Sequence, residues 1–123
     1  MNEEQSKVVE FHRRVKATIN QIPTQISTQL VKQRIRIIEE ELRELKEAMS
    51  QGNLLAVADA LADIEYAILG TAVVYGIDLE PIFKEIHRSN MTKLPPLNKD
   101  EKGVKGLEYS PPNLVKVWNE QGW

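Results

Sequence analysis

The sequence predicts an all-α chain, an antiparallel bundle of about four helices followed by a C-terminal irregular arm. Apolar residues recur at helical spacing through most of residues 2–94, and no stretch shows the sustained alternation of a strand. Beyond residue 94 the composition turns polar, with Gly and Pro and no helical period. We therefore expect one domain over residues 1–123, a length that allows a modest core, with residues 94–123 as the arm.

The first helix is expected over residues 2–20, and Pro23 closes that region. Its apolar face comprises Val8, Phe11, His12, Val15 and Ile19. The second helix is expected over residues 24–51, with a stripe whose members are four, three, four, three and four residues apart. That stripe predicts a core-facing seam of Val31, Ile35, Ile38, Leu42, Leu45 and Met49. Gly52 stands where a C-terminal cap belongs, and Asn53 stands where the next helix would be capped.

The third helix is expected over residues 54–75 and closes at Gly76. It is apolar around most of its circumference, so one antiparallel neighbour would leave much of it uncovered, which favours association with a second copy of the chain. Asp78 caps the fourth helix, whose first turn contains Pro81. This helix ends before Pro95 and is expected to bury Ile82, Phe83 and Ile86. Two tryptophans near the end of the arm, Trp118 and Trp123, indicate that it docks on another element.

Composition excludes several classes of protein. The chain has no cysteine, so disulfide scaffolds, zinc-thiolate sites and thiol nucleophiles are excluded, and its two histidines make a His-rich metal site a poor fit. Sixteen basic residues against eighteen acidic ones argue against binding nucleic acid through bulk charge. The charged N-terminus shows no secretory signal, and Asp59, Asp63 and Glu65 would oppose membrane insertion of the third helix. We expect a cytoplasmic protein.

Two glutamates of the second helix are placed beside the predicted seam. A helical projection puts Glu41 and Glu44 next to the seam, with Glu40 within a turn, while the Arg and Lys residues from 36 to 46 lie on the opposite flank. The alternative interpretation is a solvated charged face, which suits Glu39 and Glu47.

Two aspartates of the third helix, Asp59 and Asp63, share a face four residues apart. Their neighbours on that face are all small, namely Ala56, Ala60, Ala67 and Gly70. Antiparallel pairing brings both acidic pairs to about the same height, and facing carboxylates are ligands for Mg²⁺ or Mn²⁺. The alternative for Asp59 is a local cap near the helix start.

The acidic segments EEELRE (residues 39–44) and DALAD (residues 59–63) resemble those of the MazG-like, all-α nucleoside triphosphate pyrophosphohydrolases, whose pattern is EExxE followed by ExxD. Glu40, Glu41 and Glu44 match EExxE, and Asp63 matches the last position of ExxD. The glutamate of ExxD is Ala60 in this chain, and Asp59 is the nearest carboxylate.

A second block extends the resemblance to phosphoribosyl-ATP-pyrophosphohydrolase-like proteins over about residues 30–112. HRSNMTK (residues 87–93) and KGLEYSPP (residues 105–112) are similar to that group's HRSNMxK and KGxxYxPP. The resemblance implies that the substrate is contacted by Asn90 and Lys93, with Lys105 and Tyr109 closing over it. The alternatives are a helix C-terminal cap for Asn90, a cation that complements the helix dipole for Lys93, and a docked tail for Lys105 and Tyr109. Asn90 is also expected on the buried face of the fourth helix, whereas Arg88 is expected at the surface and His12 and His87 at the core edge.

The resemblance implies hydrolysis of a nucleoside triphosphate between the α and β phosphates, giving a monophosphate and pyrophosphate. We expect Glu41, Glu44 and Asp63 to bind the metal, with Asp59 or Glu40 assisting, and Glu40 or Glu41 to orient the attacking water or take its proton. The expected cofactor is Mg²⁺, with Mn²⁺ as an option, and the expected assembly is a homodimer or a dimer of dimers. The alternatives are hydrolysis of phosphoribosyl-ATP, or a non-catalytic helical binding or oligomerisation module with a degraded site.

Overall fold

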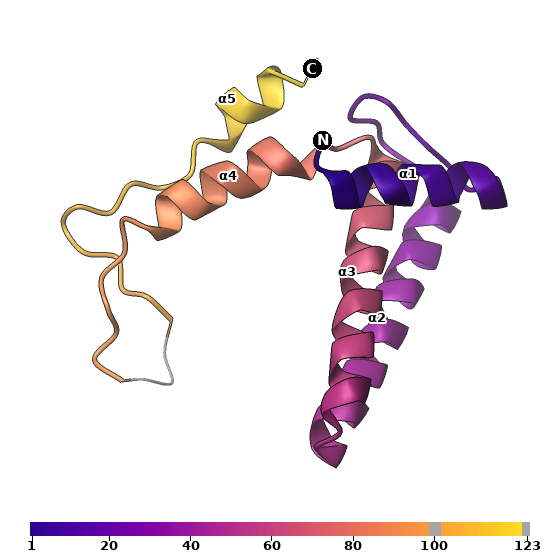
Figure 1. Ribbon diagram of the computed structural model, residues 1–123. Helices are drawn as coiled ribbons and strands as arrows, with labels where there is room; N and C mark the ends of the chain where they lie inside the picture. The colour runs from indigo at the N-terminus through magenta and orange to yellow at the C-terminus, as the bar shows by residue number, and fades with distance from the viewer. Residues whose placement is uncertain (99–101, 122–123) are drawn as a thin grey trace. The chain divides into compact units, whose positions relative to one another are not determined.

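The computed structural model describes residues 1–98 and 102–121, and Trp123 therefore lies outside the described residues. The described chain forms the five helices drawn in Figure 1, namely α1 (Glu3–Val15), α2 (Thr28–Gln51), α3 (Leu54–Tyr75), α4 (Leu79–Asn90) and α5 (Leu114–Asn119). Within these residues the extended structure is limited to an isolated bridge between Leu94 and Val104. The predicted all-α class is confirmed.

The chain divides into two compact units, Met1–Ile77 and Asp78–Trp123, which are described separately. Our expectation of one domain over residues 1–123 stays a prediction.

The first unit is built on an antiparallel hairpin of α2 and α3 (Figure 1). Ser27 caps α2 by accepting the Leu30 N–H, and α2 ends at Gly52, which takes a left-handed φ of 66°. Asn53 accepts the Ala56 N–H at 3.2 Å and begins α3 at once. A turn this short forces the two helices to run back along each other. The predicted cap residues at this turn are confirmed, whereas α2 begins four residues later than expected.

The predicted seam of α2 is only partly covered within the chain. Val31, Ile38 and Leu45 are half-buried, whereas the alternate members of the stripe are exposed, namely Ile35, Leu42 and Met49. The uncovered residues stand seven apart and form a second, solvent-facing column. The prediction that the whole stripe faces a core within one chain was therefore wrong for this second column.

Helix α1 packs across the end of the hairpin where α2 begins and α3 ends (Figure 1). It buries Val8 and His12, and the His12 ring places Nδ1 3.0 Å from the Thr18 carbonyl oxygen. His12 is therefore a core residue. The helix is shorter than predicted because it ends at Val15, and Lys16 takes a left-handed φ of 60°. Phe11 and Val15, expected on the buried face, are exposed.

The loop after α1 satisfies the last carbonyls of α3. Asn20 donates its backbone N–H to Val73 O at 3.1 Å and its side-chain amide to Val74 O at 2.7 Å. Gly76 follows with a φ of 75°, and a Cβ there would overlap the carbonyl of Ile22. The residues that we expected to extend the first helix thus cover a helix end instead.

Arg34 of α2 is buried against α3 and 9 % exposed. Its Nε donates to Thr71 Oγ1 at 3.1 Å, and its Nη2 donates to the Ala67 carbonyl at 3.0 Å. Burial lowers the pKa of this guanidinium, since both partners are neutral. The position is sterically tight, because a Cβ at Gly70 would lie 2.7 Å from Arg34 Nη2.

The second unit packs α5 against α4. Asp78 accepts the Glu80 N–H at 3.1 Å and caps α4, with Pro81 in the first turn as predicted. Gln121 exchanges two hydrogen bonds with the Asp78 backbone, accepting its N–H at 2.9 Å and donating to its carbonyl at 3.1 Å. The arm therefore docks on α4, and the expectation that it docks on another element is confirmed through Gln121. The helix α5 within the arm was not predicted.

The buried face of α4 differs from the prediction. Ser89 is almost fully buried, whereas Asn90 is exposed and Phe83 is 72 % exposed. The difference arises because the arm covers α4 on the side of Ser89. Among the described residues no single helix is long and apolar enough to cross a membrane, although α3 and α4 together reach that length and composition across the break between them.

Candidate functional site

Three carboxylates of the first unit converge between α2 and α3. Glu41, Glu44 and Asp63 each offer an oxygen, and these oxygens all lie within 4.8 Å of one another. Glu41 and Glu44 share one face of α2 because they are three residues apart. The hairpin brings Asp63 of α3 to the same level, as antiparallel pairing of the two helices predicts.

The Glu41 carboxyl group has an unusual environment. Its Oε2 is buried and has no hydrogen-bond partner among the described residues. Burial raises the pKa of Glu41 above its ordinary value, and the nearby carboxylates of Glu44, Asp63 and Glu40 raise it further. A desolvated carboxylate next to like charges is costly in free energy unless a cation or a proton compensates it.

Arg43 is a basic neighbour of two glutamates of α2, and its contact with one of them was not expected. Arg43 Nη1 lies 3.4 Å from Glu47 Oε2, an exposed ion pair that confirms the surface interpretation of Glu47. Arg43 Nη2 also lies 3.8 Å from Glu44 Oε1. The prediction that Glu44 has no basic neighbour was therefore wrong, although its side chain is 43 % exposed and water screens this contact.

Asp59 does not join the three-carboxylate group. It lies one turn before Asp63 on α3 and is exposed. Ala60, which stands where the resembling family has a glutamate, is buried, so no side chain from this turn adds a fourth carboxylate to the group. A ligand role for Asp59 stays a prediction.

The donor set suits a hard divalent cation. All three ligands are carboxylate oxygens, which Mg²⁺ and Mn²⁺ prefer over nitrogen or sulfur donors. The unpaired Glu41 Oε2 is a ligand atom without another use in the structure. Three carboxylates would leave several positions of an octahedral shell to water and to substrate oxygens.

The predicted substrate contacts all belong to the second unit. Asn90 ends α4 and Lys93 lies just beyond it, half-buried. Lys105 Nζ lies 5.1 Å from the centre of the Tyr109 ring, a cation–π contact. Gly103 lies close against Lys93, since a Cβ at Gly103 would meet Lys93 Cβ at 3.1 Å.

Sequence reasoning missed the importance of Arg88, which was expected to be a plain surface residue. Its guanidinium binds both carboxylate oxygens of Glu85, at 2.7 Å and 3.0 Å, and also reaches two residues of the arm, Ser110 and Pro111. The signal was present in the two sequence blocks HRSNMTK and KGLEYSPP, because these are the segments that Arg88 joins.

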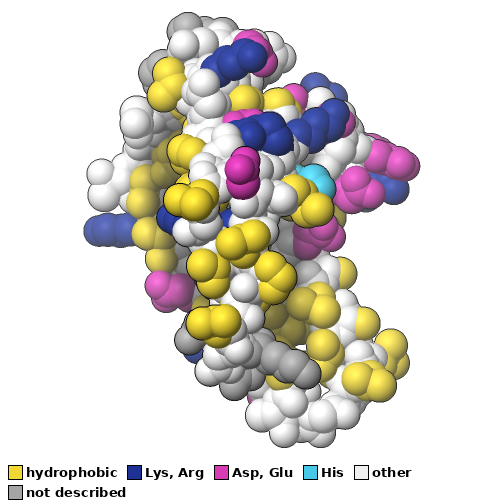
Figure 2. Space-filling model, turned by 90° about the vertical axis from the view of Figure 1, so that its left-hand side faces the viewer, with side chains coloured by type: hydrophobic (Ala, Val, Ile, Leu, Met, Phe, Trp, Pro, Cys, Tyr) yellow, Lys and Arg dark blue, Asp and Glu magenta, His cyan; other side chains and the backbone are white. Residues whose placement is uncertain are grey.

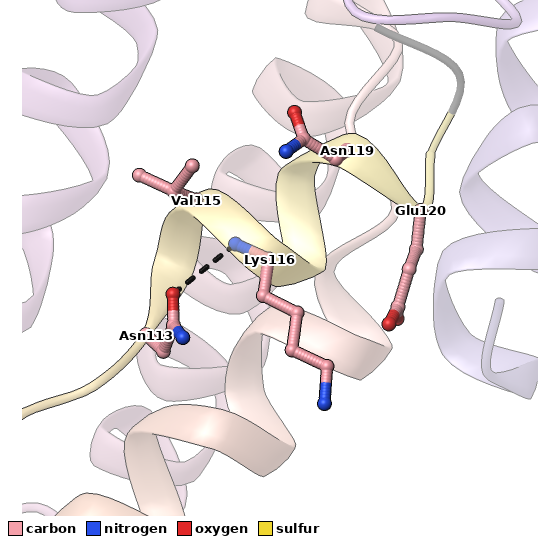
Figure 3. Close-up of a pocket in the computed structure, with 5 residues that line it drawn as sticks. All are labelled: Asn113, Val115, Lys116, Asn119 and Glu120. Atoms are coloured by element: carbon pink, nitrogen blue, oxygen red, sulfur yellow. Dashed lines mark hydrogen bonds between the residues drawn. The ribbon is translucent and has the colours of Figure 1, made fainter.

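A separate surface pocket lies on α5. Figure 3 shows its lining, in which Asn113 accepts the Lys116 N–H at 3.2 Å and so caps the helix. The pocket is lined by Asn113, Val115, Lys116, Asn119 and Glu120. It contains none of the predicted site residues, and we assign it no role in catalysis.

Comparison with known proteins supports one family. A segment of 52 residues is 42 % identical to an uncharacterized protein of Acanthamoeba polyphaga mimivirus. That match covers 42 % of this chain and 21 % of the relative, so the matched segment spans about a fifth of the relative's length. The sequence model described as phosphoribosyl-ATP pyrophosphohydrolase matches residues 8–90, which include all three carboxylates and the whole of α4. With most of its length matched, the chain belongs to the phosphoribosyl-ATP pyrophosphohydrolase family.

Proposed function

We propose that the chain is a Mg²⁺-dependent nucleoside triphosphate pyrophosphohydrolase. It would hydrolyse the α–β phosphoanhydride and release a nucleoside monophosphate and pyrophosphate. The observation that carries this proposal is the convergence of Glu41, Glu44 and Asp63 around a buried, unpaired carboxylate oxygen. Membership of a pyrophosphohydrolase family supports the same chemistry.

Glu41, Glu44 and Asp63 would hold the cation, and Asp59 is kept as an additional candidate ligand. When bound, a divalent ion neutralises phosphate oxygens and lowers the pKa of a water molecule. Glu40 or Glu41 would orient the attacking water and accept its proton. Glu40 suits this role because it is exposed and is close enough to affect the Glu41 carboxylate. The water oxygen enters one product as the bridging P–O bond breaks, and pyrophosphate leaves.

We assign substrate binding to Asn90, Lys93, Lys105 and Tyr109. The lysines offer positive charge to a polyphosphate, and the Tyr109 ring offers an apolar face. The contact between Lys105 and Tyr109 supports a shared role, since it keeps the ammonium group near the ring.

The proposal is tested by pyrophosphate release from a panel of standard and modified ribo- and deoxyribonucleoside triphosphates, with Mg²⁺ and with Mn²⁺. We expect release from at least one of them, and loss of release in Glu44→Gln. Silence across the whole panel with both metals would overturn the proposal. The control is Glu47→Gln, which removes an exposed glutamate of the same helix.

Phosphoribosyl-ATP is the second candidate substrate, because the matched family carries its name. The same assay with phosphoribosyl-ATP separates the two. If this nucleotide also gives no pyrophosphate, the remaining interpretation is a non-catalytic binding or oligomerisation module, in which the loss of the motif glutamate at Ala60 has removed activity.

We also propose that the chain self-associates, as a homodimer or a dimer of dimers. Helix α3 exposes Leu54, Leu61 and Ile68, and α2 exposes Ile35, Leu42 and Met49. Each set is spaced by seven residues and so forms one column on its helix. Figure 2 shows hydrophobic side chains exposed on the face that it draws. Two such columns in a chain of this size support a helical interface between copies. A cytoplasmic location and a lack of nucleic-acid binding stay predictions.

A further inference from the structure

The second unit contains a network of hydrogen bonds that joins two distant parts of the sequence. Arg88 Nη1 donates to Ser110 Oγ at 3.0 Å, and Arg88 Nη2 donates to the Pro111 carbonyl at 3.1 Å. The same guanidinium is fixed by Glu85 of α4. Glu85 in turn accepts the backbone N–H of Asn113 at 2.6 Å, just before α5 begins.

Two hydroxyl groups strengthen the same junction. Ser89 Oγ donates to the Ser110 carbonyl at 2.8 Å, and the Ser110 N–H donates to Thr92 Oγ1 at 2.9 Å. Ser89 is almost fully buried, so this contact is shielded from water. Residues 110–113 thus form hydrogen bonds with four side chains in or just after α4, namely Glu85, Arg88, Ser89 and Thr92.

The arm is also tied at an earlier point. Leu94 and Val104 exchange both backbone hydrogen bonds of an antiparallel bridge, each at 2.8 Å. Lys105 and Tyr109 lie between this bridge and the junction at Ser110. A segment fixed at both ends loses little further conformational entropy when it contacts a ligand.

We propose that Arg88 is a positioning residue, which together with Glu85 clasps residues 110–113 to α4 and so holds Lys105 and Tyr109 ready for the nucleotide. This inference rests on the proposed function for the role of the nucleotide, whereas the clasp itself is independent of it. The Glu85–Arg88 clasp comprises these two residues and their hydrogen bonds to Ser110, Pro111 and Asn113.

Electrostatics agrees with the geometry. The hydrogen bonds from Arg88 and from the Asn113 N–H hold the pKa of Glu85 at about 2. The hydrogen bond with the Glu85 carboxylate, together with its negative charge, raises the pKa of Arg88. Both side chains therefore stay ionised throughout the pH range in which the protein would work. Charge-assisted, two-pronged pairs of this kind restrict geometry more than a lysine pair does.

The clasp is tested first without substrate, by residue-resolved amide hydrogen exchange on the full chain. We expect the Ser110 and Asn113 amides to exchange at least about tenfold faster in Arg88→Met and in Glu85→Gln than in the wild type. Arg88→Lys should restore part of the protection. The matched control is Lys84→Met, which removes another ion pair of the same helix, in which Lys84 Nζ lies 3.7 Å from Glu80 Oε1. This control should leave the exchange rates of both amides unchanged.

The positioning role is tested by kinetics on the best nucleotide. Arg88→Met should raise KM about tenfold with kcat within about twofold, and Arg88→Lys should lie between it and the wild type. Unchanged exchange at Ser110 and Asn113 would overturn the clasp. Faster exchange with an unchanged KM would overturn the positioning role. A wild-type chain that hydrolyses no nucleotide would overturn the proposed function, and the positioning role with it, while the exchange data would still decide the clasp.

Discussion

Replacing Glu41 by Gln should stabilise the chain without metal and abolish its stabilisation by Mg²⁺. The Glu41 carboxylate lies within 4.8 Å of those of Glu44 and Asp63. Two unit charges at that distance repel by about 0.9 kcal/mol in bulk water and about 3.5 kcal/mol at an effective dielectric constant of 20. We take the lower value, because Glu44 and Asp63 are substantially exposed.

Two such repulsions amount to about 2 kcal/mol in the metal-free chain. The glutamine amide still places a polar atom at the buried position of Oε2, which offsets part of that gain. We therefore expect a net increase of about 1 kcal/mol in the free energy of unfolding. For a unit of this size, that increase corresponds to a rise in Tm of about 4–8 °C.

Magnesium should stabilise the wild type and leave the stability of Glu41→Gln almost unchanged. At ten times its Kd, a ligand that binds only the folded state adds about 1.4 kcal/mol of stability. Wild type should gain this increment in thermal melts with added Mg²⁺, and Glu41→Gln should gain almost none. Glu47→Gln serves as the control, since it should shift stability by at most about 0.5 kcal/mol and keep the response to Mg²⁺.

The pH dependence provides a second measurement of the same effect. The folded chain holds the Glu41 proton more tightly than the unfolded chain does, because the folded pKa is raised. Metal-free wild type should therefore gain stability as the pH falls through that raised pKa, and Glu41→Gln should lack this component. A metal-free Glu41→Gln that melts at or below the wild-type temperature, with the control normal, would refute the reasoning.

Three further predictions concern other parts of the chain. The hydrogen bonds from Arg88 and from the Asn113 N–H lower the pKa of Glu85 from 4.5 to about 2, so the stability from this ionised carboxyl should be complete above pH 4.5, decline as the pH falls from 4.5 to about 2, and be absent below that. An NMR titration of the Glu85 carboxyl with a midpoint near 4.5 would contradict this. Gly76→Ala should lower the free energy of unfolding by at least about 2 kcal/mol in urea titrations, because its φ is left-handed and a loop carbonyl occupies the space of a Cβ. Gly52→Ala should cost only about 1 kcal/mol, as nothing lies near its Cβ position. Leu61→Glu should reduce the mass measured by light scattering to that of one chain, and an unchanged mass of the assembly would exclude this face from the interface.

Local signals predicted the helices well where capping decides their ends. Asn53 and Gly76 delimit α3 at its predicted residues, because a side-chain acceptor and a left-handed glycine act within one turn. The ends of α1 were mispredicted for a tertiary reason. Residues after Lys16 have helical spacing in the sequence, but Asn20 is used to satisfy carbonyls of α3, far along the chain.

The acidic group was predictable because it depends only on helical spacing and on a short turn. Glu41 and Glu44 follow from three-residue spacing, and Asp63 follows from the antiparallel hairpin. Asp59 shares the face of Asp63, but its position four residues earlier moves its side chain by about 6 Å along the helix axis. Sequence spacing identifies the helix face on which a carboxylate lies. Which carboxylates of α2 and α3 meet depends on the axial register of the two helices.

The role of Arg88 could not be derived from its own helix. Its side chain is 47 % exposed, and its nearby partner Glu85 is an ordinary neighbour three residues away. The contacts that distinguish it are made to residues more than twenty positions later, in a segment without periodicity. The only sequence signal of this connection is the presence of both blocks, residues 87–93 and 105–112. The second block has no helical period, so its sequence does not predict which residues of α4 it contacts.

The small-residue face of α3 also shows what a sequence pattern can and cannot predict. A run of Ala60, Ala67 and Gly70 predicts close approach of a neighbour, but not the identity of the neighbour. At Gly70 the neighbour is the guanidinium of Arg34, whose Nη2 would lie 2.7 Å from a Cβ. Arg34 is seven residues before Glu41 and so lies on the same face of α2, about two turns away. The small residues thus admit a buried cation beside the α3 backbone at one end of the hairpin, while the same face carries the carboxylate Asp63 further along. A side chain larger than glycine at residue 70 would displace the Arg34 guanidinium from Ala67 and Thr71. The hydrogen bonds that join the N-terminal part of α2 to α3 at this point would then be lost.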